Sequence, residues 1–349
     1  MSAHSQTQGM QVRGPWSLVM RPFSWVYRAL AAMARRRALR NQVSLAVPVV
    51  VVGNVIVGGS GKTPIVAELV DHLRRGGWSP GIISRGYGAP IDANSPALHV
   101  QAATTAAQCG DEPKWLAQTT DVPVFVHPDR VLAARACLAL YPQVDVLVSD
   151  DGLQHLQLPR ALEVIVFDQR GIGNGLLLPA GLLREPWPLR TQRQPVLHVA
   201  PSPLDQPGAI HPAWRGPVYA CHRQLGARFQ RLDGQAACEG FTGKVQLLAA
   251  IAKPEAFEDM MRARAQTSGF QIGAFILRPD HDPLSGPLSD LDPSIPTVCT
   301  AKDAVKLVHN PHINPHTIWI APLEVQLASP FWAAIDAVFP RKLPPSSPL

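Results

Sequence analysis

One stretch, residues 47–64 (VPVVVVGNVIVGGSGKTP), constrains the fold more than any other part of the chain. A run of β-branched residues passes into glycines and ends on Gly-Lys-Thr-Pro, and residues 67–76 (AELVDHLRRG) then have the pattern of a helix. A buried strand, a glycine-rich turn and a helix amino terminus together present unpaired backbone N–H groups and the positive end of a helix dipole. The stretch therefore predicts an anion site of the phosphate-loop kind.

The residues of this turn have distinct expected roles. Glycines let the main chain approach phosphate oxygens with no Cβ in the way. Lys62 would reach the β- and γ-phosphates, and the Thr63 hydroxyl would ligate Mg²⁺. One position departs from the usual G-x-x-x-x-G-K-[ST] spacing, because Ile56 stands where that pattern has glycine. An ordinary glycine turn is the alternative. The residues predicted to bind nucleotide are Gly58, Gly59, Ser60, Gly61, Lys62 and Thr63.

A second strand supplies carboxylates. Residues 144–155 (VDVLVSDDGLQH) have the pattern of an apolar strand that ends at Asp150 and Asp151. Phosphate-loop sites usually place a carboxylate at the end of another parallel strand, where it holds Mg²⁺ directly or through water. Two adjacent carboxylates repel each other unless a cation or hydrogen bonds neutralise them. We therefore predict that Asp150 and Asp151 form the magnesium environment, with a turn rich in Asp and Gly as the alternative.

Further polar clusters stand where other strands should end, namely IISRGYG at 82–88, CGDEP at 109–113 and VFVHPDR at 124–130. In open α/β sheets the loops at that edge form the ligand crevice. Taken singly, each cluster is more typical of a turn or a solvated salt bridge. We predict Asp111 as the general base, because transfer to a hydroxyl needs a carboxylate near the nucleophile and the other two carboxylates belong to the metal. The apolar loop at 167–186 ends near Arg184, which could meet a phosphate, or the loop simply packs on its domain.

Residues 15–40 have the pattern of a helix that lies in a membrane interface. Arginines recur at positions 21, 28 and 35, and they form one stripe because seven residues make almost two helical turns. The opposite face carries Trp, Phe, Tyr and Leu side chains, which suit headgroup depth beside anionic lipid. A spanning helix needs about 20 mostly apolar residues, and Arg21 and Arg28 interrupt the run too early. A helix docked on the rest of the protein and a basic tail for nucleic acid are the alternatives.

Length and composition favour an enzyme of two domains. A chain of 349 residues with 46% apolar and 17% charged residues fits neither a disordered chain nor a multi-span membrane protein. The five scattered cysteines include no C-x-x-C pair, which argues against a zinc site or a disulfide framework. From about residue 240 strand and helix patterns alternate again, which predicts a second α/β layer. The predicted fold is thus a P-loop-type, mostly parallel α/β sheet with flanking helices, a second smaller α/β domain and an amino-terminal amphipathic membrane helix.

The predicted division of the chain follows from these patterns. The ranges are a membrane-associated helix at 1–44, a P-loop core domain at 45–205 and a smaller α/β domain at 206–349. The boundary near residue 205 falls in the Pro-rich segment SPLDQPGAIHP. We expect the smaller domain to close over the site, because an open kinase site would hydrolyse its nucleotide.

Taken together, the motifs resemble one family, tetraacyldisaccharide 4'-kinase, the lipid A 4'-kinase that phosphorylates a membrane-bound glucosamine disaccharide. The matching pieces are VGNVIVGGSGKTP, SRGYG, GDEP, the DR at 129–130, SDDGLQH, RGIGNGLLLPAGLLREP and TAKDAVKL. The resemblance implies a P-loop kinase fold, with ATP and Mg²⁺ as cofactors. It implies transfer of the γ-phosphate to the 4'-hydroxyl of a tetraacylated disaccharide 1-phosphate, in lipid A biosynthesis. It also implies a peripheral or monotopic protein on the cytoplasmic face of the inner membrane.

The resemblance further implies roles for particular residues. It gives Lys62 and Asp111 catalytic roles and adds His281, in the RPDH segment, as a helper of the Asp111 base. Three features depart from the family pattern. The stretch AAIAKPEAF at 249–257 lacks a glycine that the family usually has there, Asp282 stands where a second histidine is common, and Ala301 stands where an acidic residue is usual. The residues implied to line the substrate site are Arg85, Tyr87, Arg130, His155 and Arg184.

Two interpretations from other classes stay open. A membrane-associated P-loop NTPase acting as a switch or delivery factor would hydrolyse nucleotide without a lipid acceptor, although the chain has no N-K-x-D guanine signature. A non-catalytic nucleic-acid binder is opposed by the lack of aromatic and basic interleaving beyond the first helix. We expect no nucleic-acid partner, and a monomer, although the sequence does not fix the oligomeric state.

Overall fold

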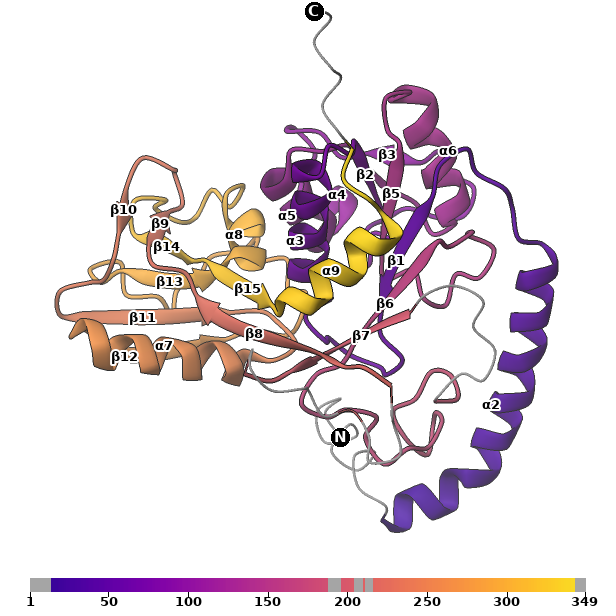
Figure 1. Ribbon diagram of the computed structural model, residues 1–349. Helices are drawn as coiled ribbons and strands as arrows, with labels where there is room; N and C mark the ends of the chain where they lie inside the picture. Colours follow the sequence, from indigo (N-terminus) through magenta and orange to yellow (C-terminus); the bar gives the residue numbers. More distant parts are fainter. Residues whose placement is uncertain (1–13, 188–195, 204–209, 211–215, 343–349) are drawn as a thin grey trace, which may run out of the picture. The chain divides into compact units, whose positions relative to one another are not determined.

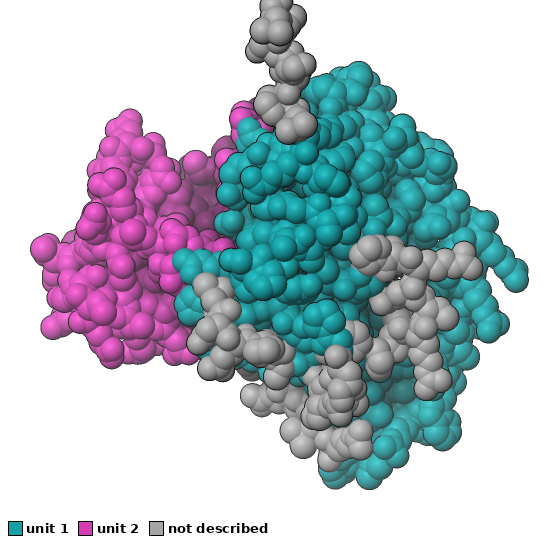
Figure 2. All heavy atoms as spheres, viewed as in Figure 1, with its two compact units in different colours: residues 1–85, 129–222, 326–349 teal, residues 86–128, 223–325 magenta. Residues whose placement is uncertain are grey.

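The computed structural model describes residues 14–187, 196–203, 210 and 216–342. These residues form two compact units, coloured in Figure 2. Unit 1 comprises Met1–Arg85, Asp129–His222 and Gln326–Leu349, and unit 2 comprises Gly86–Pro128 and Arg223–Val325. The chain therefore passes back and forth between the units, whereas the ranges predicted from sequence are continuous. The division into folding domains stays a prediction.

Unit 1 is built on parallel strands. Its sheet follows the order β8-β7-β6-β1-β5-β2, and every neighbouring pair in that order is parallel. The first strand in the chain, β1, lies inside this order, and its four valines are buried on both faces. This burial is why the strand is a continuous apolar run rather than an alternating one. The strands are β1 (Val49–Gly53), β2 (Pro80–Ser84), β5 (Val146–Asp150), β6 (Leu162–Val166), β7 (Val196–Pro201) and β8 (Tyr219–Leu225). The mostly parallel α/β class predicted for the first part of the chain is confirmed.

Among the described residues of unit 1 there are four helices (Figure 1): α2 (Pro15–Arg40), α3 (Lys62–Arg75), α6 (Arg130–Leu140) and α9 (Ser329–Val338). The carboxyl-terminal helix α9 packs on α3, where the Trp332 ring stacks on the His72 ring with centroids 4.4 Å apart. Asp336 of α9 accepts a hydrogen bond from the same His72 ring over 2.7 Å. These contacts explain why the end of the chain belongs to unit 1 although its sequence follows unit 2.

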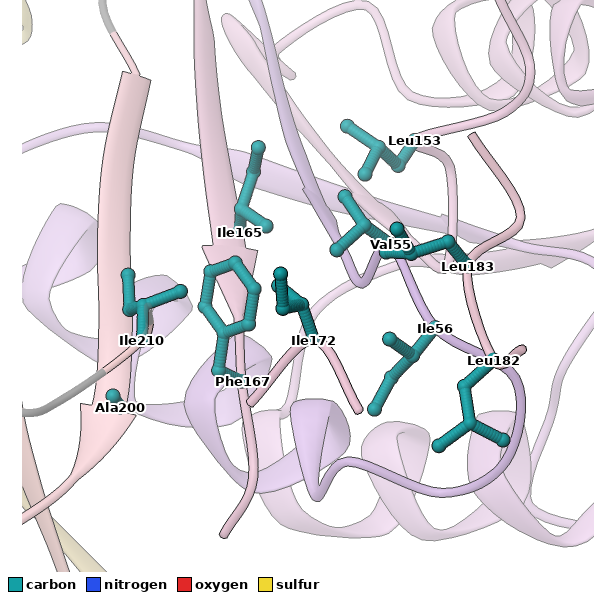
Figure 3. Packing of buried hydrophobic residues seen from close by; sticks show 10 residues of the cluster. All are labelled: Val55, Ile56, Leu153, Ile165, Phe167, Ile172, Leu182, Leu183, Ala200 and Ile210. Carbon is teal, nitrogen blue, oxygen red and sulfur yellow. The ribbon is translucent and has the colours of Figure 1, made fainter. Parts of the chain in front are cut away.

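The phosphate-loop stretch and the apolar loop after residue 167 form one core cluster (Figure 3). Ile56 is fully buried and makes a β-bridge with Leu183, while the Val57 N–H donates to the Leu182 carbonyl over 3.0 Å. The departure from glycine at position 56 therefore has a structural reason, because this residue anchors the base of the loop in the core. The apolar loop is buried against the phosphate loop, as one of the two sequence interpretations expected.

Unit 2 contains a six-stranded sheet of order β10-β9-β14-β13-β11-β12. Its strands β11 to β14 pair in parallel, and β9 and β10 add antiparallel pairs at one edge. They are β9 (Phe229–Arg231), β10 (Ala237–Cys238), β11 (Lys244–Ala249), β12 (Gln271–Leu277), β13 (Thr297–Thr300) and β14 (Ile318–Ala321). A short antiparallel pair also belongs to this unit, formed by β3 (Leu98–His99) and β4 (Val124–Val126). Strands and helices alternate after residue 240, as the sequence pattern predicted, and Pro322 separates β14 from the next strand, β15 (Leu323–Leu327).

The helices of unit 2 are α4 (Ala106–Cys109), α5 (Asp111–Thr120), α7 (Pro254–Ser268) and α8 (Ala301–Leu307). Helix α8 begins at a Thr300 cap, whose hydroxyl oxygen accepts a hydrogen bond from the Asp303 N–H. Helix α5 begins directly after Gly110, which has φ of +93°. A Cβ at Gly110 would lie 2.9 Å from the Tyr87 carbonyl oxygen, so the CGDEP turn requires glycine there.

Among the residues described, no helix combines the length and the apolar character needed to cross a membrane.

Candidate active site

The sheet register places the phosphate loop beside the predicted carboxylates. Val52 of β1 pairs with Asp150 of β5, so both strands end at the same level. Helix α3 then begins at Lys62, which follows Gly61 in a left-handed conformation with φ of 70°. Gly58 also has positive φ, +90°, and a Cβ there would lie 3.3 Å from the Arg170 guanidinium. The strand, turn and helix predicted from the sequence are thus present, and the helix amino terminus faces the edge where the strands end.

The Lys62 ammonium lies between two acceptors. Its Nζ is 3.2 Å from Asp151 Oδ1 and 3.3 Å from Asn54 Oδ1. Asp151 adopts φ of 50°, a left-handed conformation directly after β5. Burial raises the pKa of the Asp151 carboxyl, but the positive charges of Lys62 and Arg184 outweigh burial, so this pKa lies below its usual 3.8. The carboxylate is ionised at neutral pH.

Oxygen donors suited to a hard cation gather at this edge. Asp150 is 1% exposed and Thr63 is 2% exposed, and both lie at the ends of the elements that frame the loop. In the described part of the chain, no group of three or more His, Cys, Asp or Glu side chains could hold a metal ion by itself. Magnesium commonly uses one or two carboxylates, waters and substrate phosphates rather than a cage made only of protein. The donor set therefore fits Mg²⁺ delivered together with a phosphate chain.

Two of the predicted substrate-site arginines contact Asp151. The Arg130 Nη2 donates to the Asp151 carbonyl oxygen over 3.2 Å, and Arg184 Nη1 lies 3.7 Å from Asp151 Oδ2. Burial and the neighbouring charge of Arg85 lower the pKa of Arg130 to about 10, against the opposing effect of nearby carboxylates. Arg85 itself is exposed just after β2. The cluster of positive charge is what an anionic substrate requires.

His155 lies in the same unit. Its Nε2 is 3.3 Å from Oδ1 of Asp129, the residue whose side chain caps α6 by accepting from the Val131 N–H. Burial and the Arg130 charge lower the pKa of the His155 imidazole. The ring is therefore neutral at neutral pH, and it can donate or accept a hydrogen bond without adding charge.

The other predicted residues lie in unit 2. The His281 Nδ1 faces both oxygens of the Asp111 carboxylate, at 3.2 Å and 3.1 Å. The exposed Tyr87 ring lies with its centroid 5.0 Å from that of His281. The sequence-predicted residues thus form one group around Lys62 in unit 1 and a second group around Asp111 in unit 2. The structure supports the expected Asp111–His281 pair as a contact, whereas its catalytic role is a proposal.

The electrostatics of the Asp111–His281 pair favour its ionised form. Burial raises the pKa of the Asp111 carboxyl, but the hydrogen bond with His281 and the charge of Lys302 outweigh burial and bring this pKa below 3.8. The hydrogen bond to Asp111 raises the pKa of His281 above 6.5, against burial. Lys302, from the TAKDAVKL segment, also forms an ion pair with Glu112, the residue after Asp111. This contact gives the Lys302 position a role that sequence reasoning did not assign.

Sequence reasoning missed three polar side chains around the phosphate loop. Asn54 contacts Lys62 and the loop, and Gln154 donates to the Asn54 carbonyl oxygen over 3.0 Å. Gln154 also donates to Glu185 Oε1 over 3.1 Å. The sequence indicated these residues only through their location, because each is a polar residue within a motif already assigned to the site.

The fold and the first group of residues define a class of protein. A parallel α/β sheet with a phosphate loop after a central strand, and carboxylates at the end of the adjacent strand, is the architecture of P-loop kinases and nucleoside triphosphatases. One solved structure with a similar fold is described as the apo form of LpxK from Aquifex aeolicus in complex with ATP. It superimposes with a TM-score of 0.71 at 24% identity, covering 93% of this chain and 99% of that chain.

The comparisons with protein families identify the particular member of this class. The family model described as tetraacyldisaccharide-1-P 4'-kinase matches residues 16–340. A tetraacyldisaccharide 4'-kinase from Delftia acidovorans is 42% identical over 331 residues, covering 93% of this chain and 91% of its own length. One of the same name from Aromatoleum aromaticum is 44% identical over 305 residues, covering 85% and 86%. The chain belongs to the tetraacyldisaccharide-1-P 4'-kinase family, and the family resemblance seen in the sequence motifs is confirmed.

Proposed function

We propose that the protein transfers the γ-phosphate of ATP to the 4'-hydroxyl of a tetraacylated glucosamine disaccharide 1-phosphate, giving lipid IVA in lipid A biosynthesis. Family membership over nearly the whole chain supports the reaction and the acceptor. The observation that carries the proposal is the position of Lys62, at the start of α3 and 3.2 Å from the Asp151 carboxylate at the end of β5. A chain of this family with that arrangement has the phosphate-binding half of a kinase.

Unit 1 supplies the residues for the phosphates and the metal. The N–H groups from Gly58 to Thr63 would cradle the phosphate chain, and the Lys62 ammonium would offset charge on the transferred group. Asp150, Asp151 and the Thr63 hydroxyl would hold Mg²⁺, which supplies charge neutralisation at the phosphates when bound. Among the arginines of the cluster, Arg130 and Arg184 carry charge suited to the 1-phosphate of the acceptor.

Unit 2 supplies the proposed base. The Asp111 carboxylate would receive the proton of the acceptor hydroxyl, and His281 would hold that carboxylate in place through its Nδ1. An ionised carboxylate is needed for this role, and the lowered pKa of Asp111 is consistent with it. Tyr87, beside His281, is assigned to the substrate with His155 and Arg85, on the basis of the family resemblance alone.

Helix α2 is the proposed membrane contact. Its buried positions are the small polar residues Ser17 and Ser24, whereas its large apolar side chains point outward. The Trp25 side chain is 70% exposed and the Phe23 side chain is 58% exposed. A helix that buries serine and exposes tryptophan is typical of an interfacial helix, because the exposed apolar face lacks a protein partner within the described chain. We place the protein on the inner membrane surface, facing the cytoplasm, where a lipid acceptor and ATP are both available.

The proposal is tested with radiolabelled ATP and the purified acceptor lipid in detergent micelles. The wild-type protein is expected to transfer label to the lipid. The Lys62→Ala and Asp111→Ala variants are expected to lower kcat by factors of about 10² or more while remaining folded. Label released as inorganic phosphate at the same rate with or without acceptor lipid would favour the alternative, a nucleotide-driven switch or delivery factor. Near-normal turnover of Asp111→Ala would remove the base assignment while leaving the kinase activity in place.

The membrane assignment has its own test. Flotation with vesicles containing phosphatidylglycerol is compared for wild type and the Phe23→Ser/Trp25→Ser variant, which should bind at least about tenfold more weakly because two large apolar side chains are lost. Leu132→Ser/Leu140→Ser serves as the control, since it removes two exposed apolar side chains elsewhere on unit 1. Equal loss of binding in both variants would show that α2 has no special role.

A further inference from the structure

The side chain of Asn54 spans the phosphate loop. Asn54 is the first residue after β1 and is fully buried. Its Nδ2 donates to the Gly58 carbonyl oxygen over 3.2 Å, and its Oδ1 accepts from Lys62 Nζ over 3.3 Å. One amide therefore contacts a carbonyl near the start of the glycines and the ammonium at their end.

A second strand end holds Asn54 in place. Gln154, four residues after Asp150, donates its Nε2 to the Asn54 carbonyl oxygen over 3.0 Å and to Glu185 Oε1 over 3.1 Å. The Gln154 Oε1 accepts from Arg184 Nη1 over 3.3 Å. Each end of the Gln154 amide thus has a protein partner, so its orientation is fixed. Because Gln154 donates to the backbone carbonyl of Asn54, it also restricts the position of Asn54.

The structure of the loop explains why its glycine segment needs the contacts of Asn54. Because Ile56 is buried in the core, the first part of the loop is held by apolar packing, and the glycine segment that follows depends on polar contacts for its position. Lys62 also has a competing partner in the Asp151 carboxylate, at 3.2 Å. A carboxylate attracts an ammonium more strongly than a neutral amide does, and it would draw the ammonium toward the proposed metal ligand. The Asn54 amide gives the ammonium a second acceptor without adding negative charge near the phosphates.

We infer that Asn54 is a positioning residue for phosphate transfer, setting the Lys62 ammonium and the Gly58 carbonyl so that the loop accepts the terminal phosphate of the nucleotide. The inference rests on the proposed function, because it concerns how the same loop would bind a nucleoside triphosphate more tightly than a diphosphate. Its consequence is specific, because the loss of Asn54 should weaken contacts to the γ-phosphate more than contacts to the rest of the nucleotide.

The test measures binding of MgATP and MgADP by titration calorimetry, using a non-hydrolysable ATP analogue to prevent turnover. The Asn54→Ala variant is expected to lose about ten- to a hundredfold in affinity for the triphosphate, the usual effect of a hydrogen bond to a charged group, and much less for ADP. Asn54→Asp keeps an acceptor for Lys62 but loses the donor to Gly58 and adds a negative charge. It is therefore expected to bind the triphosphate at least as weakly as Asn54→Ala.

A double-mutant cycle separates this role from a merely structural one. In the Lys62→Ala background, Asn54→Ala should change the ratio of triphosphate to diphosphate affinity by less than about twofold, because the partner through which it acts is already absent. Gln246→Ala is the matched control. Gln246 is a buried amide of β11 in unit 2 that donates to Asp292 and Thr297, so its loss should lower the thermal midpoint without changing the affinity ratio.

The outcomes are distinct from those for the proposed function. An unchanged affinity ratio in folded Asn54→Ala, with the wild-type protein phosphorylating its lipid acceptor, would overturn the positioning role and leave the kinase assignment intact. Equal losses for triphosphate and diphosphate would also overturn it, since that pattern indicates general damage to the loop. Wild-type protein that discriminates ATP from ADP through Asn54, yet phosphorylates no acceptor, would support the positioning role and count against the proposed reaction.

Discussion

The ion pair between Arg160 and Glu163 offers a stringent test of the energetics of unit 1. The two side chains are 5% and 4% exposed, and Arg160 Nη1 lies 2.5 Å from Glu163 Oε1. Glu163 belongs to β6, inside the parallel sheet. Arg160 also donates to the carbonyl oxygens of Leu153 and His155, at 3.1 Å and 3.0 Å. The guanidinium therefore compensates a buried carboxylate and holds the segment that carries the proposed metal and substrate residues.

The expected magnitudes follow from burial. Arg160→Met leaves the Glu163 charge without its partner, which should lower the free energy of unfolding by about 3–5 kcal/mol. The double variant Arg160→Met/Glu163→Leu removes that charge and takes one donor from each of the two carbonyl groups, at a cost of about 1–3 kcal/mol. The His155 carbonyl keeps the bond that it accepts from the Leu158 N–H over 3.2 Å. The double variant is thus expected to be more stable than the single Arg160→Met variant.

Urea denaturation followed by tryptophan fluorescence measures this ordering, with circular dichroism at the start of each titration to show that all variants are folded. A double variant as unstable as the sum of the two single variants would refute the reasoning, because it would mean that the buried charges do not interact. Arg75→Met is the control, since its ion pair with Asp71 is more than half exposed on both sides and should contribute about 0.5 kcal/mol or less.

Three further predictions concern other parts of the chain. The His281 imidazole should titrate above pH 6.5 by NMR, and Asp111→Asn should bring the value down; the stabilisation from the pair is full below pH 6.5 and is lost as pH rises through the raised pKa of His281. Ser24→Val should speed proteolysis within α2, because Ser24 Oγ donates to the Leu177 carbonyl over 2.8 Å and accepts from the Ala180 N–H over 3.1 Å, and valine can make neither bond; unchanged cleavage would argue against this docking. Trp332→Ala should lower the free energy of unfolding by about 1–3 kcal/mol in thermal denaturation through loss of the stacking on His72, whereas an unaltered midpoint would show that α9 adds little.

Much of unit 1 could be predicted from sequence because its signals are local or follow from parallel pairing. The run of valines before the glycines indicates a strand buried on both faces, and Lys62 follows from the spacing of the loop. Asp150 could be placed beside the loop because the carboxyl ends of neighbouring parallel strands meet at one edge of a sheet. The register of Val52 with Asp150 shows that this step of the reasoning was sound.

The remaining features depend on contacts between distant parts of the sequence. Nothing local indicates that residues 86–128 belong to unit 2 or that α9 returns to unit 1, because those outcomes depend on tertiary packing. The role of Ile56 was equally inaccessible, since its partner Leu183 lies in a loop that has no periodic pattern. Pairing of Lys302 with Glu112 likewise joins two segments far apart in the chain. The pattern of a single sequence shows the periodicity of its helices and strands. It does not show which distant segments come into contact in the folded chain.

The segment at 177–185 connects the proposed membrane contact with the phosphate loop. On one side it receives α2, through the bond from Ser24 to Leu177 and the bond from the Tyr27 hydroxyl to the Arg184 carbonyl, each 2.8 Å long. On the other side the Arg184 N–H donates to the Val55 carbonyl over 2.8 Å. The two sets of contacts share a backbone of fewer than ten residues, so a displacement of α2 would be transmitted to the base of the phosphate loop. Packed interiors transmit such strain because they have little free volume to absorb it. Docking of α2 and the geometry of the loop are therefore expected to respond together to substitutions in this segment.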